Sequence, residues 1–208
     1  MARHIGWLML ALAATAGPAL AQVKAPAAGG GERVAVLERL PERIGSFARS
    51  GPVRQDTTAN VEDGAILRYQ GASGFMTVFL YRMGGPAIPN GTESPIVQAE
   101  LAGSERSMLN TMAQPGPDGI PRAPAELITG YAFAAPDGPR FRCVEARRAI
   151  PAPQGAGGGW HQHEHVCVTG HMQGYLKMRV TYRAPDPEGE RVRDAVQALV
   201  GGAAAAVR

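Results

Sequence analysis

A chain of 208 residues, of which 45% are hydrophobic, is long enough to bury one sizeable core. Its 21 Lys and Arg residues nearly balance 18 Asp and Glu residues, which leaves a net charge of +3, and the basic residues are dispersed along the sequence. This balance argues against the concentrated basic surface that nucleic-acid binding requires, so no nucleic-acid partner is expected.

The first 21 residues have the three parts of a secretory signal peptide. A short basic start containing Arg3 precedes an apolar run over residues 5–16, which is too short to span a bilayer comfortably. Ala19-Leu20-Ala21 then supplies the small residues that a signal peptidase accepts. We therefore expect cleavage between Ala21 and Gln22, a periplasmic or secreted protein, and no membrane span in the mature chain. An uncleaved membrane anchor is the alternative.

The residues after the cleavage site, 22–40, are expected to form a flexible leader. Residues 22–33 are mostly small and include Gly29-Gly30-Gly31, so they bury little apolar surface. Residues 34–40 are compatible with a short helical turn or strand before Pro41. The folded part is predicted to be a single domain over residues 41–202, with a tail at 203–208.

In the first half of that domain the pattern predicts strands followed by a helix. Residues 44–50 fit a short strand, and residues 65–70 and 75–83 fit a hairpin around a turn of small residues. Ser94 and Pro95 mark a helix start, since Ser caps free N–H groups and Pro tolerates the first turn. That helix extends to about Ala113, with an apolar stripe formed by Val97, Leu101, Met108 and Met112.

The second half repeats this order. Its predicted strands are residues 127–134, 141–150, 159–169 and 174–183, and the last alternates apolar and polar side chains. Asp186-Pro187-Glu188 then begins a C-terminal helix. We expect Gly201-Gly202 to end it after a stripe formed by Val192, Val196, Leu199 and Val200.

Strands, helix, strands, helix is an order typical of an α+β fold, a largely antiparallel sheet with two amphipathic helices packed on it. The strand Tyr175–Tyr182, the Ala-Pro-Asp-Pro link and the final helix resemble the ending of Mog1/PsbP-like α/β/α sandwich domains. The resemblance is one of element order over residues 40–200. The segments 40–45 and 79–81 also resemble uncharacterised secreted bacterial proteins. Neither resemblance implies an activity.

Cys143 and Cys167 both lie in the exported part, where an even pair most simply forms a disulfide. A thiol nucleophile or a metal ligand is the alternative. If the two cysteines face each other in an antiparallel hairpin, Glu145 faces His165, Arg147 faces His163 and Ala149 faces His161. The turn then falls within residues 151–159, which are rich in Gly and Pro.

The segment 160–167, Trp-His-Gln-His-Glu-His-Val-Cys, places three histidines on one face of a strand. His161, His163 and His165 could bind zinc or copper, with Glu145 or His171 completing the ligand set. Arg147 argues against this, because a fixed cation disfavours a nearby divalent ion. The opposite face is apolar and would carry Val144, Ala146, Val166 and Val168, so the histidines are expected to be exposed or under a loop.

We favour a simpler interpretation, in which these histidines form a polar strand face that pairs with Glu145 and Glu164 or meets solvent. Sensing of pH through imidazole protonation is a third possibility. No catalytic signature is recognisable: Ser104 lies inside a predicted helix and lacks the strand-turn-helix setting of a nucleophile elbow. No glycine-rich loop is followed by Lys and Ser or Thr, as a phosphate-binding loop would require.

The leading prediction is therefore a non-enzymatic exported module without a cofactor, which binds an envelope protein or a small ligand through its sheet face and loops. The alternative is a periplasmic transition-metal-binding protein that uses His161, His163, His165 and Glu145. A hydrolase built on Glu145 and His165 is a third class.

Overall fold

The computed structural model describes residues 30–58, 61–115, 122–135, 138–152, 155, 157–185 and 189–207. The predicted signal peptide, its cleavage site at Ala21 and Gln22, and residues 22–29 of the predicted leader lie outside these ranges.

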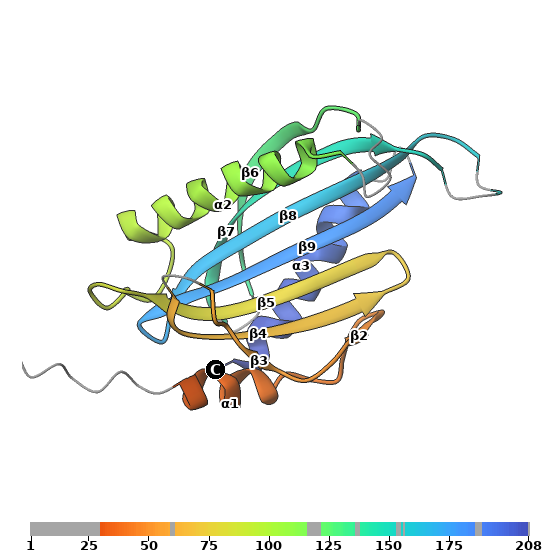
Figure 1. Cartoon of the computed structure of the whole chain (residues 1–208). Helices are drawn as coiled ribbons and strands as arrows, with labels where there is room; N and C mark the ends of the chain where they lie inside the picture. The colour runs from red at the N-terminus through yellow and green to blue at the C-terminus, as the bar shows by residue number, and fades with distance from the viewer. Residues whose placement is uncertain are drawn as a thin grey trace, which may run out of the picture.

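The described residues form three helices and nine strands (Figure 1). In chain order the elements are α1 (Gly30–Glu38), β1 (Arg43–Ile44), β2 (Phe47–Arg49), β3 (Arg54–Gln55), β4 (Val61–Gly71), β5 (Gly74–Met83), α2 (Pro95–Ala113), β6 (Glu126–Ala134), β7 (Arg140–Ile150), β8 (Trp160–His171), β9 (Gly174–Pro185) and α3 (Gly189–Ala206).

All strands belong to one antiparallel sheet with the order β1-β2-β4-β5-β9-β8-β7-β6, and β3 pairs with β4 beside this path. Most neighbours in the sheet are also neighbours in the chain. The exceptions are the pairing of β2 with β4 and the pairing of β5 with β9, which joins the first half of the chain to the second. The predicted largely antiparallel sheet is therefore confirmed.

Helices cover both faces of this sheet, as Figure 1 shows with α2 in front and α3 behind. Helix α2 packs on β7 and β8 and buries Val97, Met108 and Met112 against one face. Its start is as predicted, since the Ser94 side chain accepts a hydrogen bond from the Ile96 N–H. Helices α1 and α3 bury their apolar residues in the core on the other face.

Helix α1, which was not among the two predicted helices, lies inside the segment predicted to be a leader. Residues 34–40 were compatible with a short helical turn, but the helix begins earlier, at Gly30, and is packed in the core. Val36, Leu37 and Leu40 are buried in the main core. The Arg33 guanidinium donates to Asp63 of β4 at 2.8 Å, and both side chains are buried. The burial of these apolar side chains outweighs the poor helix propensity of the glycines at its start.

Helix α3 also continues past the Gly201-Gly202 pair that was expected to end it. Its apolar stripe extends into the predicted tail, where Ala203, Ala204 and Val207 are buried. A Cβ on Gly202 would lie 2.7 Å from a methyl carbon of Ile44. Gly202 thus allows α3 to approach β1 closely. No helix among the described residues is long and apolar enough to cross a bilayer.

Candidate metal centre

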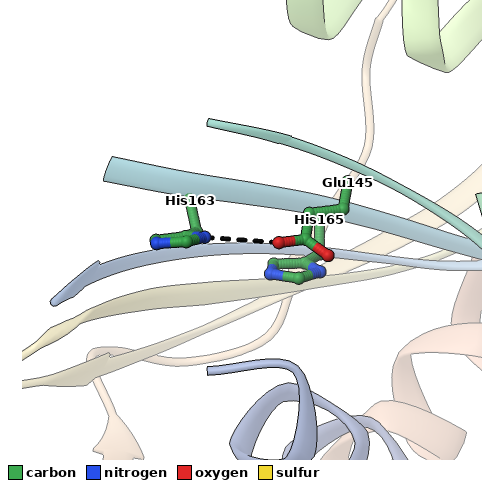
Figure 2. A group of neighbouring side chains, drawn as sticks. All are labelled: Glu145, His163 and His165. Atoms are coloured by element: carbon green, nitrogen blue, oxygen red, sulfur yellow. Dashed lines mark hydrogen bonds and ion pairs between the residues drawn. The ribbon is translucent and has the colours of Figure 1, made fainter. Parts of the chain in front are cut away.

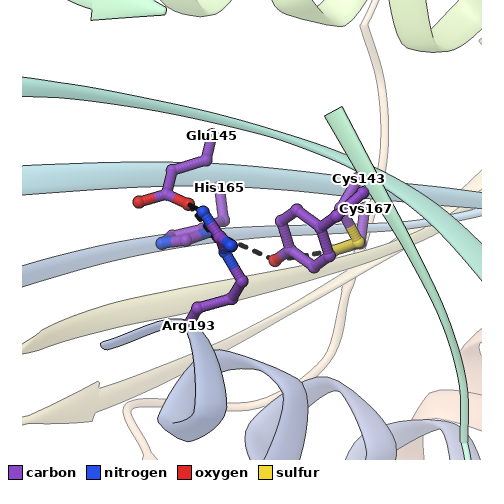
Figure 3. The surroundings of a disulfide bond; sticks show 6 residues. Cys143, Glu145, His165, Cys167 and Arg193 are labelled. Carbon is purple, nitrogen blue, oxygen red and sulfur yellow. Dashed lines mark hydrogen bonds and ion pairs between the residues drawn. A yellow bond between two sulfur atoms is a disulfide. The ribbon is translucent and has the colours of Figure 1, made fainter. Parts of the chain in front are cut away.

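The pairing of β7 with β8 follows the register that the cysteines predict. Cys143 faces Cys167 and the two form a disulfide, and Glu145 faces His165 (Figure 3). Arg147 faces His163 in the same register. Because side chains alternate along a strand, this register places Glu145 and the histidines on the same face as the disulfide. The opposite face carries Val144, Ala146, Val166 and Val168, which pack in the core beneath α2, as predicted.

The expectation that the histidines are exposed or covered by a loop is wrong for His163 and His165, whereas His161 is half-buried. Helix α3 packs against this face, and His165 is 0% exposed, Glu145 1% and His163 3%. A polar strand face in solvent is thereby ruled out for these three residues, whereas the predicted pairing of a histidine with Glu145 is observed at His163. Such burial demands that each polar atom find a partner, so the hydrogen bonds of this group decide what it can do.

Glu145, His163 and His165 form a compact cluster (Figure 2). Each offers one ligand atom, and the three atoms lie within 4.8 Å of one another. His163 Nδ1 donates a hydrogen bond to Glu145 Oε1 at 3.3 Å. The two imidazole rings are nearly parallel, with centroids 6.4 Å apart. A carboxylate and two imidazoles are a common donor set for zinc and copper(II).

Two other histidines that the sequence offered as ligands lie outside the cluster. His161 is not among the residues whose ligand atoms converge, and its ring is turned by 65° relative to that of His163. His171, at the far end of β8, donates from Nε2 to the Val207 carbonyl at 2.9 Å. The structure therefore brings together Glu145, His163 and His165 of the predicted set.

Sequence reasoning missed Arg193, a residue of α3 that reaches the cluster from the facing layer (Figure 3). Its Nε and Nη2 donate to Glu145 Oε2 at 3.0 and 2.7 Å. The cation expected at this position, Arg147, instead forms an ion pair with Glu126 of β6. The only signal for Arg193 is its place beside Val192, at the border of the apolar stripe of α3.

These charges keep the Glu145 carboxylate ionised. Burial alone would raise its pKa, but the hydrogen bond from His163, the charge that His165 carries when protonated, and the ion pair with Arg193 lower the pKa of Glu145 to about 2. Arg193 is charged at every accessible pH, so it is the permanent counter-ion of this buried carboxylate.

His165 is the least satisfied member of the cluster. Its Nδ1 lies 3.1 Å from the Tyr131 hydroxyl of β6, while its Nε2 is buried and has no hydrogen-bond partner among the described residues. Burial lowers the pKa of His165 to about 4, so the ring is neutral at pH 7. A buried ring nitrogen without a partner costs roughly 1–3 kcal/mol, so a ligand that binds Nε2 would recover this cost.

Tyr131 can hold His165 in the tautomer that a metal requires. Its hydroxyl lies between His165 Nδ1 and the Cys167 sulfur, at 3.1 and 4.0 Å. A disulfide sulfur can only accept, so the hydroxyl can donate to it and accept from Nδ1–H. That arrangement leaves the lone pair on Nε2 free for an ion, as in many metal sites where the second ring nitrogen is fixed by a hydrogen bond.

Glu145 and His165, the pair on which a hydrolase was predicted, face each other as expected, but no hydrogen bond joins their side chains in the described part of the chain. Among the described residues, Glu145 accepts hydrogen bonds from His163 and Arg193, while His165 contacts Tyr131. No model of a known protein family matches this sequence, and no curated protein matches it. The functional argument below therefore starts from the geometry of this cluster.

Proposed function

We propose that this protein is a non-enzymatic, exported metal-binding module that holds one zinc or copper(II) ion between Glu145, His163 and His165. The observation that carries the proposal is the buried, unpartnered Nε2 of His165, which lies beside two further donor side chains. Export to the periplasm and kinship with Mog1/PsbP-like domains belong to the same proposal. An envelope partner or a small organic ligand stays a prediction from the sequence.

The chemistry of the donors supports a transition metal over a hard cation. Zinc and copper(II) bind imidazole well, whereas calcium and magnesium prefer sets of six or more oxygen ligands. Two imidazoles and one carboxylate supply three ligands, which matches the number that proteins contribute to many zinc sites with one open position. Nearby apolar residues and the covering helix α3 would shield the ion from water.

The test is a titration of the untagged, metal-free protein with zinc and with copper(II), followed by calorimetry and elemental analysis. We expect one ion per chain. The single changes Glu145→Gln, His163→Gln and His165→Gln should each weaken binding by at least roughly 10- to 100-fold, because each removes a ligand. Circular dichroism should show that the variants remain folded.

His161→Gln is the matched control, since it removes an imidazole from the same strand but from outside the cluster. Its affinity should stay within about threefold of the wild type. Sub-stoichiometric binding by the wild type would refute the proposal. If His161→Gln lost as much metal affinity as His163→Gln, the ion would instead be bound loosely along the row of strand histidines.

A further inference from the structure

We propose that Arg193 is a built-in competitor for the metal, which lowers the affinity of the site and restricts it to ions that bind imidazole strongly. This inference rests on the proposed function. It assigns to Arg193 a role in specificity, because its guanidinium holds the carboxylate oxygen that an incoming ion would also seek.

Both carboxylate oxygens of Glu145 accept hydrogen bonds from side chains of the protein. Oε1 accepts from His163 Nδ1, and Oε2 accepts two hydrogen bonds from Arg193. An ion bound by Glu145 would therefore lie only a few ångströms from a guanidinium that cannot lose its proton. Two positive charges at such a distance in a buried site repel each other strongly. Binding therefore requires the Arg193 side chain to move.

Arg193 can move without disturbing the helix that carries it. Its side chain is 31% exposed, whereas Glu145 beneath it is buried. The neighbouring helix residues Val192 and Val196 are anchored in the core, so α3 can stay in place while the side chain turns toward solvent. That movement gives up the ion pair and the packing of the guanidinium over the Tyr131 ring, whose centroid lies 5.3 Å away.

This exchange discriminates between classes of metal ion. An ion such as manganese(II) gains most of its binding energy from carboxylate oxygen, so it must displace Arg193 from Glu145 directly. Zinc and copper(II) gain much of theirs from the imidazoles of His163 and His165, whereas the two hydrogen bonds of Arg193 described above both go to the carboxylate of Glu145. Removing the arginine should therefore strengthen the binding of every divalent ion, and the affinity for manganese(II) should rise by the largest factor.

The experiment compares Arg193→Met with Arg191→Met, which removes the same charge from an exposed position on the same helix. Zinc and manganese(II) are titrated into each metal-free protein by calorimetry. We expect Arg193→Met to bind zinc at least about tenfold more tightly than the wild type, with a larger gain for manganese(II). The affinities of Arg191→Met for zinc and manganese(II) should remain within about threefold of the wild-type values.

Arg193→Gln provides a second variant should the methionine variant fold poorly, because glutamine can still donate one hydrogen bond to Glu145 without a charge. Unchanged or weaker zinc binding in both Arg193 variants, together with stoichiometric binding by the wild type, would overturn the role of Arg193 and leave the metal site intact. Absence of zinc binding in the wild type and in all variants would overturn the proposed function itself.

Discussion

Replacing both Cys143 and Cys167 by alanine is expected to lower the free energy of unfolding by about 3.5 kcal/mol. The disulfide closes a loop between residues 24 positions apart and so restricts the unfolded chain. Both cysteines are also buried in the core, so the smaller alanines add a packing loss. In a domain of this size such a change lowers Tm by roughly 10 °C.

Urea denaturation of the wild type, of the double variant, and of the wild type with a phosphine reductant measures this effect. The reductant should shift the wild-type midpoint toward that of the variant, since unfolding exposes the disulfide. An alkylation assay verifies that the disulfide is intact in the wild-type sample. Equal urea midpoints for that sample and for the double variant would contradict a stabilising role of the disulfide.

The metal-free protein is expected to lose about 3 kcal/mol of stability through His165 as the pH falls from 7 to 4. The pKa of His165 is about 4 in the folded state because the ring is buried, against 6.5 for an exposed histidine. Below pH 6.5 His165 is therefore protonated in the unfolded chain but stays neutral in the folded chain until the pH approaches 4. The contribution is complete above pH 6.5 and is lost as the pH approaches 4.

The measurement is the free energy of unfolding by urea, in chelator-treated protein, across this pH range. His165→Gln should show a shallower fall than the wild type. His171→Gln is a useful comparison: burial also lowers the pKa of His171, yet His171 lies outside the cluster, so this variant should retain the contribution of His165. Parallel pH curves for the wild type and His165→Gln would show that His165 titrates normally in the fold.

Much of the sheet could be predicted because its signals are local. The cysteine pair together with the alternation of side chains determined the β7–β8 register, and the same register emerges in the structure. The short strands at the edge of the sheet have too few residues to show an alternation of apolar and polar side chains. The strand predicted over residues 44–50 is in fact the hairpin of β1 and β2, divided by Gly45, whose φ of 57° permits a tight turn.

The candidate site could be predicted only in part, because its covering layer is distant in the sequence. His163, His165 and Glu145 share a face by periodicity and register alone. Arg193 is 48 residues from Glu145, and Tyr131 is 34 residues from His165. No local pattern indicates that α3 would pack on the histidine face. For that reason the burial of the cluster and its true counter-ion were not predicted.

The pairing of β5 with β9 determines when this protein can complete its fold. These strands bring together Tyr81 with Tyr175 and Gly74 with Tyr182, about a hundred residues apart in the sequence, which is a pairing typical of slow folding. Until β9 has emerged from the ribosome, β5 and β8 lack the neighbour that they share in the finished sheet. The sheet can therefore be completed only after Gly174–Pro185 has been made, near the end of the chain, and until then its two halves remain separate.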